Sequence, residues 1–463
     1  MPGDIDIVQV FFLQGFTAQY GDWVHGLSSA VKVPNAAAID PESDCRVFFP
    51  QTDYQPVMVS RAIDGIQVSD VEYAEMLYGQ EGVDDIERIT GMTERTVQRP
   101  VQTASSLPGM DDLVVLQIEN RDDMHMKILV VEYITGGGLV DVSLPSGLLH
   151  EGELMLQALL TDLLALKDLE IAVTRDYRLF QVRFAAQQGN PAQIVIHDGD
   201  DLLQVLQKLL QQFDAVWPIA PESGNILHNI SRLVESAGKT LLNSSAEAVA
   251  VAGDKKKTCA CLQHHGILTV PCHPFSASEH SAARQWVVKP CDGVGCSDVY
   301  LLSDQADFQR LQAIISDHDN YILQPYLQGR TLSLSCLFAD GRGWLLSCNE
   351  QQIETIDGRF ELLACRVNVQ ADTGACRRLI DRIALAIPGL WGYAGIDLID
   401  SDAGLWVVEI NPRLTTSFAG LRDALGINTA QLVLDLLDGT PEISRSCDDS
   451  IVIDIAGENC RAS

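Results

Sequence analysis

The stretch GYAGIDLIDSDAGLWVVEINPRLTTSFAGL, residues 392–421, decides the fold of this chain. Two short apolar runs, AGIDLI and LWVVEI, flank the turn-forming sequence DSDAG, a pattern typical of an antiparallel hairpin. Pairing the two strands symmetrically about Ala403 predicts that Asp397 lies opposite Glu409. The hairpin therefore brings two carboxylates together.

The two faces of this hairpin differ in chemistry. Because side chains alternate along a strand, Asp397, Glu409 and Asn411 share one face. The expected core face is formed by Ile396, Leu398, Val408 and Ile410. Facing carboxylates repel each other, whereas Mg²⁺ takes oxygen ligands and is usually held by one or two carboxylates plus substrate phosphates. The pattern predicts a metal site, and a solvated acidic hairpin is the alternative.

The same residues carry a family resemblance. Gly395-Ile396-Asp397 and Glu409-Ile410-Asn411-Pro412-Arg413 resemble the metal-binding end of an ATP-grasp domain. The continuation LTTS with Gly420-Leu421 is similar to a narrower group, the tyramine- and tyrosine–glutamate ligases of methanofuran and methylofuran biosynthesis. The resemblance covers about residues 126–440.

The resemblance implies an α/β fold of the α+β ATP-grasp type, in which a small parallel pre-ATP-grasp lobe precedes a two-lobed ATP-grasp domain. Residues 1–123 match no family that we recognise, and acidic residues there outnumber basic ones about threefold. The expected domains are an unassigned acidic N-terminal domain (1–123), the pre-ATP-grasp lobe (124–225), the ATP-grasp domain (226–440) and a C-terminal tail (441–463).

Composition narrows the class of protein. The chain has 463 residues with 46% hydrophobic and 21% charged side chains, as in globular proteins of two to four domains. A net charge of −31 argues against nucleic-acid or anionic-membrane partners. No signal peptide or membrane span is visible, and twelve cysteines lack a repeating spacing, which indicates a cytoplasmic protein with free thiols. We expect small-molecule substrates, and self-association into a homo-oligomer stays open.

Before the ATP-grasp region, strand patterns alternate with helix patterns. The expected strands are Lys127–Tyr133, Glu170–Thr174, Ala192–His197 and Ala215–Ile219, and the expected helices are Gly152–Leu166 and Asp200–Phe213. This alternation predicts a parallel α/β layer. The resemblance places Glu132, Gly136–Gly138, His150–Gly152 and Pro221–Ser223 near the cleft. For Glu222 the alternative is the N-cap of the next helix.

The nucleotide-binding residues follow from the resemblance and from charge. Lys255, after Asp254 at a helix start, resembles the first lysine that reaches phosphate, and Lys289 on strand Trp286–Pro290 resembles the second. Gly293 and Gly295 form a loop whose amides can converge on an anion. The run YILQPYLQG at 321–329 resembles the hinge that reads adenine. The expected hinge contacts are Gln324, Tyr326 and Leu327.

Cysteines and histidines at 259–273 suggest a rival metal site. A structural zinc site usually takes ligand pairs at Cys-x₂₋₄-Cys spacing. Cys259 and Cys261, two positions apart at a helix start, would point their thiols in different directions. The spacing therefore favours small core residues over zinc.

Together these residues predict an ATP-dependent, ADP-forming carboxylate–amine ligase. Mg²⁺, or Mn²⁺, would be held by Asp397, Glu409 and Asn411, and Arg413 would stabilise an acyl phosphate. By resemblance the acid is glutamate and the amine is that of tyrosine or tyramine. The alternatives are a ligase that joins other amino acids or peptides and a degenerate, non-catalytic nucleotide-binding protein.

Overall fold

The computed structural model describes residues 125–455, apart from 180–181, 183–189, 276–284, 294 and 296–297, together with six short backbone strands before residue 121. The chain divides into two compact units, Met1–Met124 and His125–Ser463. Described strands of the first unit are β1 (Val10–Phe12), β2 (Ala30–Val31), β3 (Tyr54–Val57), β4 (Arg61–Ile63), β5 (Ile66–Val68) and β6 (Val115–Asn120). They form a sheet of order β2-β1-β6-β3 and a β4-β5 ribbon.

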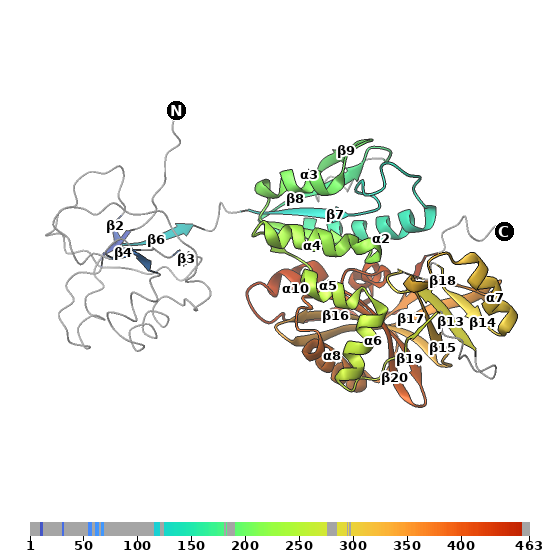
Figure 1. The fold of residues 1–463 in the computed structure, drawn as a ribbon. Helices are drawn as coiled ribbons and strands as arrows, with labels where there is room; N and C mark the ends of the chain where they lie inside the picture. The colour runs from blue at the N-terminus through green and yellow to red at the C-terminus, as the bar shows by residue number, and fades with distance from the viewer. Residues whose placement is uncertain are drawn as a thin grey trace. The chain divides into compact units, whose positions relative to one another are not determined.

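The second unit begins with a parallel sheet, as the sequence predicts. Its strands are β7 (Met126–Glu132), β8 (Leu169–Asp176), β9 (Ala192–Ile196), β10 (Ala215–Ile219) and β11 (Thr240–Leu241). They are ordered β11-β10-β7-β8-β9, and every pair is parallel. The helices of this first lobe are α2 (Ser146–Leu164), α3 (Leu202–Leu209) with the 3₁₀ turn η3 (Leu210–Gln212), and α4 (Ile226–Ser236) after η4 (Ser223–Asn225) (Figure 1).

The start of α2 is a correction to the expected helix. It begins at Ser146 rather than Gly152, after Pro145, and no side chain caps it, so the sequence has no start signal there. Gly152 lies inside the helix, where an added Cβ would come within 2.9 Å of the Glu132 carboxylate. This glycine therefore allows close packing of α2 on β7 and does not mark a helix boundary.

A large, mainly antiparallel sheet forms the rest of the unit (Figure 1). Its strands are β12 (His273–Pro274), β13 (Trp286–Pro290), β14 (Tyr300–Leu302), β15 (Tyr321–Pro325), β16 (Arg330–Ala339), β17 (Arg342–Ile356), β18 (Arg359–Val367), β19 (Gly392–Ser401), β20 (Gly404–Asn411) and β21 (Ile451–Asp454). The order is β12-β15-β13-β14-β18-β17-β16-β19-β20, and β21 pairs with β18. The helical elements are α5 (Ala246–Ala252), α6 (Lys255–His264), α7 (Gln305–Ile314), η5 (His318–Asn320), α8 (Thr373–Ala386), η6 (Thr416–Gly420), α9 (Leu421–Leu425) and α10 (Thr429–Asp435).

Four elements of this lobe differ from the sequence expectation. The sequence pattern predicts a strand over residues 344–348 and none at β18, whereas β17 runs to Ile356 and β18 pairs with it. The amphipathic pattern predicts a helix from Asp381, whereas α8 begins eight residues earlier at Thr373, because Asp372 caps it by accepting a hydrogen bond from Ala375 N. The segment 441–463, expected to be a tail, contributes β21 to the sheet.

The β19–β20 hairpin confirms the predicted pairing of Asp397 with Glu409. A two-residue turn connects the strands, and Gly404 follows it at φ +118°, a conformation that favours glycine. The register shifts by one residue after Asp397, so that Leu398 pairs with Val407. This bulge corrects the expected core face: Val407, rather than Val408, is fully buried with Ile396, Leu398 and Ile410.

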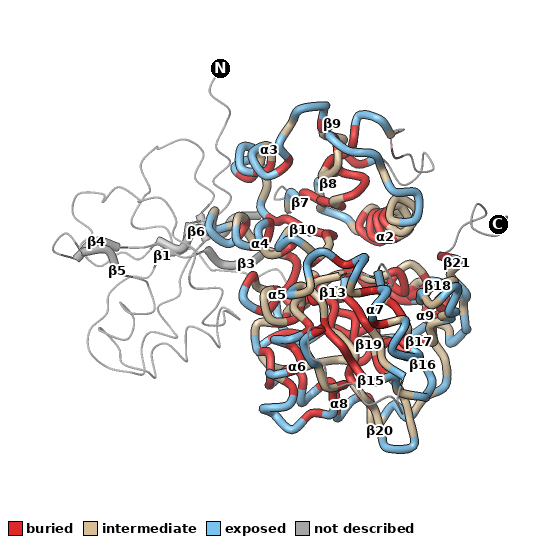
Figure 2. The backbone as a smooth tube through the Cα atoms, turned by 45° about the vertical axis from the view of Figure 1, so that its right-hand side comes forward, coloured by how far each residue is buried: buried red, intermediate tan, exposed pale blue. Residues whose placement is uncertain are grey.

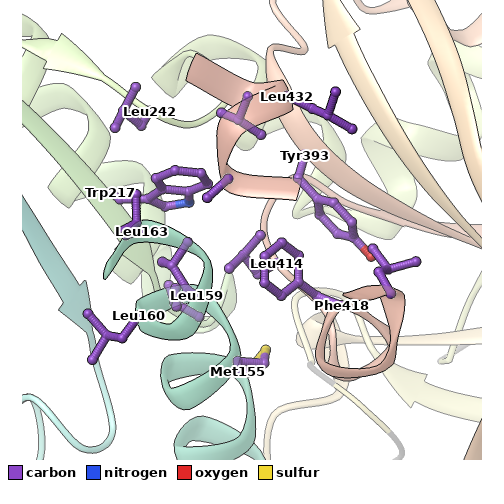
Figure 3. Close-up of a cluster of buried hydrophobic side chains, with 14 of the residues drawn as sticks. Met155, Leu159, Leu160, Leu163, Trp217, Leu242, Tyr393, Leu414, Phe418 and Leu432 are labelled. Carbon is purple, nitrogen blue, oxygen red and sulfur yellow. The ribbon is translucent and has the colours of Figure 1, made fainter. Parts of the chain in front are cut away.

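One hydrophobic core joins the two lobes of this unit. Figure 3 shows side chains of α2 and Trp217 of β10 meeting Tyr393, Leu414, Phe418 and Leu432 of the larger lobe. Figure 2 shows buried stretches of backbone both in α2 and in the strands of the large sheet. Because interiors pack densely, this shared core fixes the position of α2 relative to the end of β20.

A buried carboxylate reinforces the joint. Asp162 of α2, only 3% exposed, accepts hydrogen bonds from Arg422 Nε at 2.6 Å and from the backbone N–H groups of Thr429 and Ala430 at the start of α10. Burial raises the pKa of Asp162, although these partners work in the opposite direction. The first lobe thus meets the larger lobe through both apolar and polar contacts.

Candidate active site

The hairpin face predicted to hold metal is assembled by β19 and β20. Asp397 and Glu409 are directly cross-strand, and Asn411 pairs with Gly395 one step further along. Asn411 Nδ2 donates to Asp397 Oδ2 at 3.2 Å, and Gln351 Nε2 of β17 donates to Asp397 Oδ1 at 3.0 Å. The predicted oxygen ligands therefore lie together on one face.

The first predicted lysine lies against this cluster. Lys255 Nζ is 3.0 Å from Glu409 Oε2 and donates to Gly293 O at 2.6 Å. Its position follows from local sequence, because Asp254 caps α6 by accepting from the N–H groups of Lys256 and Lys257. The cap makes Lys255 the first helical residue, and its side chain is buried at 7% exposure.

The second predicted lysine is buried deeper in the sheet. Lys289 lies on β13, an inner strand that pairs with β14 on one side and β15 on the other. Burial lowers its pKa, while Glu409 works in the opposite direction. A buried ammonium group needs nearby negative charge, which Glu409 and Asp397 supply.

Two carboxylates beside two lysines titrate as a coupled group. Burial and the nearby Glu409 raise the pKa of Asp397. Burial also opposes ionisation of Glu409, but Lys255 and Lys289 outweigh it and lower its pKa. The pair thus ionises one carboxyl at a time in the protein alone. A divalent cation would favour both ionised forms, and two carboxylates plus an amide oxygen suit Mg²⁺.

A cavity beside this cluster is lined by the remaining predicted nucleotide contacts except Gly293. It reaches from Asp397 and Glu409, past Lys289, to the residues after β15. The predicted residues on its wall are Lys289, Gly295, Gln324, Tyr326, Leu327, Asp397 and Glu409. Tyr326 stacks on Phe360 of the unexpected strand β18, with ring centroids 6.4 Å apart. One end of the cavity is therefore apolar and aromatic and the other is charged.

Gln324 lies on this wall but is already engaged. Its Nε2 donates to Val270 O at 3.0 Å and to Cys272 Sγ at 3.2 Å, and the residue is 4% exposed. The side chain amide thus ties β15 to the segment before β12. Gln324 therefore remains a candidate for nucleotide contact because it lines the cavity, although its amide nitrogen is already hydrogen-bonded.

A second, smaller cavity opens on the other side of the carboxylates. It shares Gly295, Gln351, Leu362, Asp397 and Glu409 with the first cavity. Its other walls include Asn411, Arg413, the hydroxyl residues Thr415, Thr416 and Ser417, and Glu151 from α2. Asp397 and Glu409, two of the predicted metal ligands, therefore line both the first, elongated cavity and this compact polar one, whereas Asn411 lines only the compact one.

Arg413 is held by the first lobe. Its Nε lies 3.0 Å from Glu222 Oε1, and the two side chains are 11% and 5% exposed. Burial would lower the pKa of Arg413, but the Glu222 carboxylate outweighs it and raises the pKa. Glu222 precedes α4 and makes no side-chain cap there, so the capping alternative is wrong.

For three residues of the site, the sequence carries only a weak signal of a functional role or none. Gln351 stands in a sequence, Asn349-Glu350-Gln351, that resembles the narrower family, and this was its only signal. Glu151 lies 241 residues before Gly392, the first residue of the hairpin, in a region of weak resemblance, and Ile455 lies after the hairpin. Only tertiary packing brings the last two to the cavity.

The rival zinc motif does not assemble in the described chain. Cys259 Sγ donates toward Val270 O and Cys261 Sγ toward Ala386 O, so the two thiols face different segments. Within residues 125–455, as far as they are described, no group of three or more His, Cys, Asp or Glu side chains has a geometry for metal. The same described residues include no helix long and apolar enough to cross a membrane.

Known families match both lobes of this unit. Residues 252–417 match the model of the ATP-grasp domain, and residues 169–249 match that of the pre ATP-grasp 3 domain. The second unit therefore contains a pre-ATP-grasp domain followed by an ATP-grasp domain, and its homologues support an ATP-dependent ligase.

Two curated relatives have a more narrowly defined activity than the family models describe. The tyramine–L-glutamate ligase of Methanocaldococcus fervens is 28% identical over 304 residues, which are 64% of this chain and 89% of the relative. The ligase of the same name from Methanocaldococcus jannaschii is 27% identical over 304 residues, 64% of this chain and 84% of the relative.

Solved structures confirm the fold. An ATP-grasp superfamily protein from Archaeoglobus fulgidus aligns with a TM-score of 0.51 at 20% identity, over 71% of this chain and 99% of its own. The biotin carboxylase domain of the Hydrogenobacter thermophilus 2-oxoglutarate carboxylase, in complex with MgADP, ADP and bicarbonate, aligns with a TM-score of 0.53 at 15% identity. It covers 70% of this chain and 72% of that one. Identities this low support the fold alone.

Proposed function

We propose that this protein joins the carboxylate of glutamate to the amine of tyramine or tyrosine, with ATP and Mg²⁺, through an acyl phosphate. One observation supports this most: Asp397, Glu409 and Asn411 lie where an elongated cavity meets a compact one that contains Arg413. A phosphoryl group at this junction would face nucleotide on one side and acceptor on the other. Both curated relatives are tyramine–L-glutamate ligases, which suggests the substrates.

The residues of the first cavity would bind the nucleotide. The Tyr326–Phe360 pair and Leu327 form an apolar wall for a base, while Lys289 and Lys255 lie at the charged end. Lysine ammonium groups offset phosphate charge in a buried site more strongly than in water. Asp397, Glu409 and Asn411 would hold Mg²⁺, which neutralises charge as the terminal phosphoryl moves.

The residues of the second cavity would bind the acceptor. Arg413 is held by Glu222 and lies beside the metal ligands, so its guanidinium is positioned without further ordering. A preorganised cation stabilises the charge that develops on a carboxylate during phosphorylation and on the tetrahedral species after amine attack. No side chain of this site needs to act as a nucleophile.

The reaction products test this mechanism. The protein should convert glutamate, tyramine and MgATP to the amide, ADP and phosphate, and ¹⁸O from the glutamate carboxylate should appear in phosphate. AMP as the stoichiometric product would contradict the acyl-phosphate route. Replacing Mg²⁺ by Mn²⁺ in the same assay shows whether the site accepts both ions.

A metal-ligand variant separates the ligase from a non-catalytic nucleotide-binding protein. Glu409→Gln keeps the shape of the side chain and removes its charge, so turnover should fall at least about a hundredfold while the protein stays folded. Glu247→Gln, at an exposed position of α5, is the matched control. Wild-type turnover of Glu409→Gln would refute the metal assignment. A panel of amino acids and amines distinguishes glutamate and tyramine from other substrates.

A further inference from the structure

The compact cavity has one lining residue from the first lobe among the described residues, Glu151. It lies in the second turn of α2, half-buried, on the side of the cavity that the first lobe supplies. The shared core that packs α2 against η6 determines where its carboxylate is held. Glu151 is therefore part of the cavity wall and not simply a surface residue of α2.

The Glu151 carboxylate is oriented but not neutralised. Thr416 Oγ1 donates to Glu151 Oε2 at 3.0 Å. Arg413 is the nearest cation of the cavity wall, yet its Nε is 3.0 Å from Glu222, and no described side chain forms an ion pair with Glu151. A half-buried carboxylate that faces a cavity and forms no ion pair with a described side chain favours a cationic ligand.

We propose that Glu151 binds the ammonium group of the incoming primary amine and accepts its proton when the amide forms. This inference rests on the proposed ligase function and deepens it. Arg413 would contact the carboxylate-derived end and Glu151 the amine end of one cavity. The charges of the two residues therefore match the two reacting groups.

The chemical step needs such a base. A primary alkylamine is almost fully protonated at neutral pH, with a pKa near 10.4 for a lysine-like group, and an ammonium cannot attack carbon. The proton passes to the Glu151 carboxylate, and the nitrogen lone pair forms the C–N bond to the acyl carbon. The C–O bond to phosphate then breaks, phosphate leaves with the bonding electrons, and it takes up the second proton that the nitrogen loses as the neutral amide forms.

The environment of Glu151 supports this role. Burial raises its pKa, which moves the carboxyl toward the operating pH of a base. The hydrogen bond from Thr416 and the charges of Arg413 and His150 work in the opposite direction and keep it ionisable. The surrounding groups thus favour a carboxylate that can still take up a proton.

A comparison of two nucleophiles tests the inference. Hydroxylamine is largely unprotonated at neutral pH and traps an acyl phosphate without needing a base. In Glu151→Gln the rate of amide formation from glutamate and tyramine should fall about a hundredfold or more, while hydroxamate formation with hydroxylamine falls much less. The tyramine rate of the variant should also rise about tenfold per pH unit between 7 and 9, as free amine accumulates.

The outcomes distinguish this inference from the proposed function. Equal losses with both nucleophiles, or no loss with tyramine, would overturn the role of Glu151. If wild-type protein consumes no ATP with glutamate and hydroxylamine, the proposed function itself fails, and this inference fails with it. Glu247→Gln should behave as wild type with both nucleophiles.

Discussion

The ion pair between Arg413 and Glu222 offers the sharpest test of how the two lobes build the site. Glu222 belongs to the first lobe and Arg413 follows β20, and their Nε and Oε1 atoms are 3.0 Å apart. Because both side chains are almost fully buried, Glu222→Ala should leave the guanidinium charge uncompensated. The free energy of unfolding should fall by about 3–5 kcal/mol, and Arg413→Ala should cost a similar amount.

The double variant measures the coupling. Removing both partners leaves no unpaired buried charge. The loss of unfolding free energy in Glu222→Ala/Arg413→Ala should therefore be smaller than the sum of the two single losses, by at least about 2 kcal/mol. Asp307 and Arg310 of α7 provide a control pair at the same 3.0 Å separation. Their side chains are 26% and 55% exposed, so the same cycle should give a coupling below about 1 kcal/mol.

Urea unfolding of the full chain, followed by tryptophan fluorescence, measures these free energies, since Trp217 lies in the core that the lobes share. Single losses that add to within about 0.5 kcal/mol of the double loss would refute the reasoning. Turnover of Glu222→Ala should also fall more than its affinity for ATP, because Arg413 lines the compact cavity and not the elongated one.

Three further changes have defined outcomes. Lys289→Ala should weaken ATP binding, measured by calorimetry, more than glutamate binding, whereas Lys257→Ala, 59% exposed on α6, should change neither. Burial raises the pKa of Glu132 from 4.5 to about 7, so the folded protein binds this proton more tightly than the unfolded chain does. Stability should therefore fall by about 3 kcal/mol as pH rises from about 4.5 to 7, and Glu132→Gln should remove this slope in urea titrations at several pH values. A slope unchanged in the variant would assign the pH dependence to other groups. A chain that begins at Met126 should remain soluble and release ADP, because the division between compact units precedes it; failure to fold would show that residues 1–124 share its core.

Local periodicity and spacing were sufficient to predict the hairpin and the pairing of its two carboxylates. The pairing of Asp397 with Glu409 follows from a period of two and a short turn, both of which are properties of neighbouring residues. The parallel order of the first sheet follows similarly from strands that alternate with helices. The bulge that exchanges Val407 for Val408 in the core has no such local signal, because one extra residue leaves the apolar composition of the strand unchanged.

Contacts between distant segments decided the rest. The resemblance placed Glu151 and Glu222 near the cleft, but no local pattern indicates their partners. They reach Thr416 and Arg413 because the shared core packs α2 and β10 of the first lobe against the segment that follows β20. β18 and β21 form because their partners are present in the sheet, and the Tyr326–Phe360 wall depends on them. The sequence by itself determined which groups could hold metal and phosphate. The packing of residues that are far apart in the chain decided which groups line the cavity proposed for the acceptor. No local sequence pattern indicates that packing.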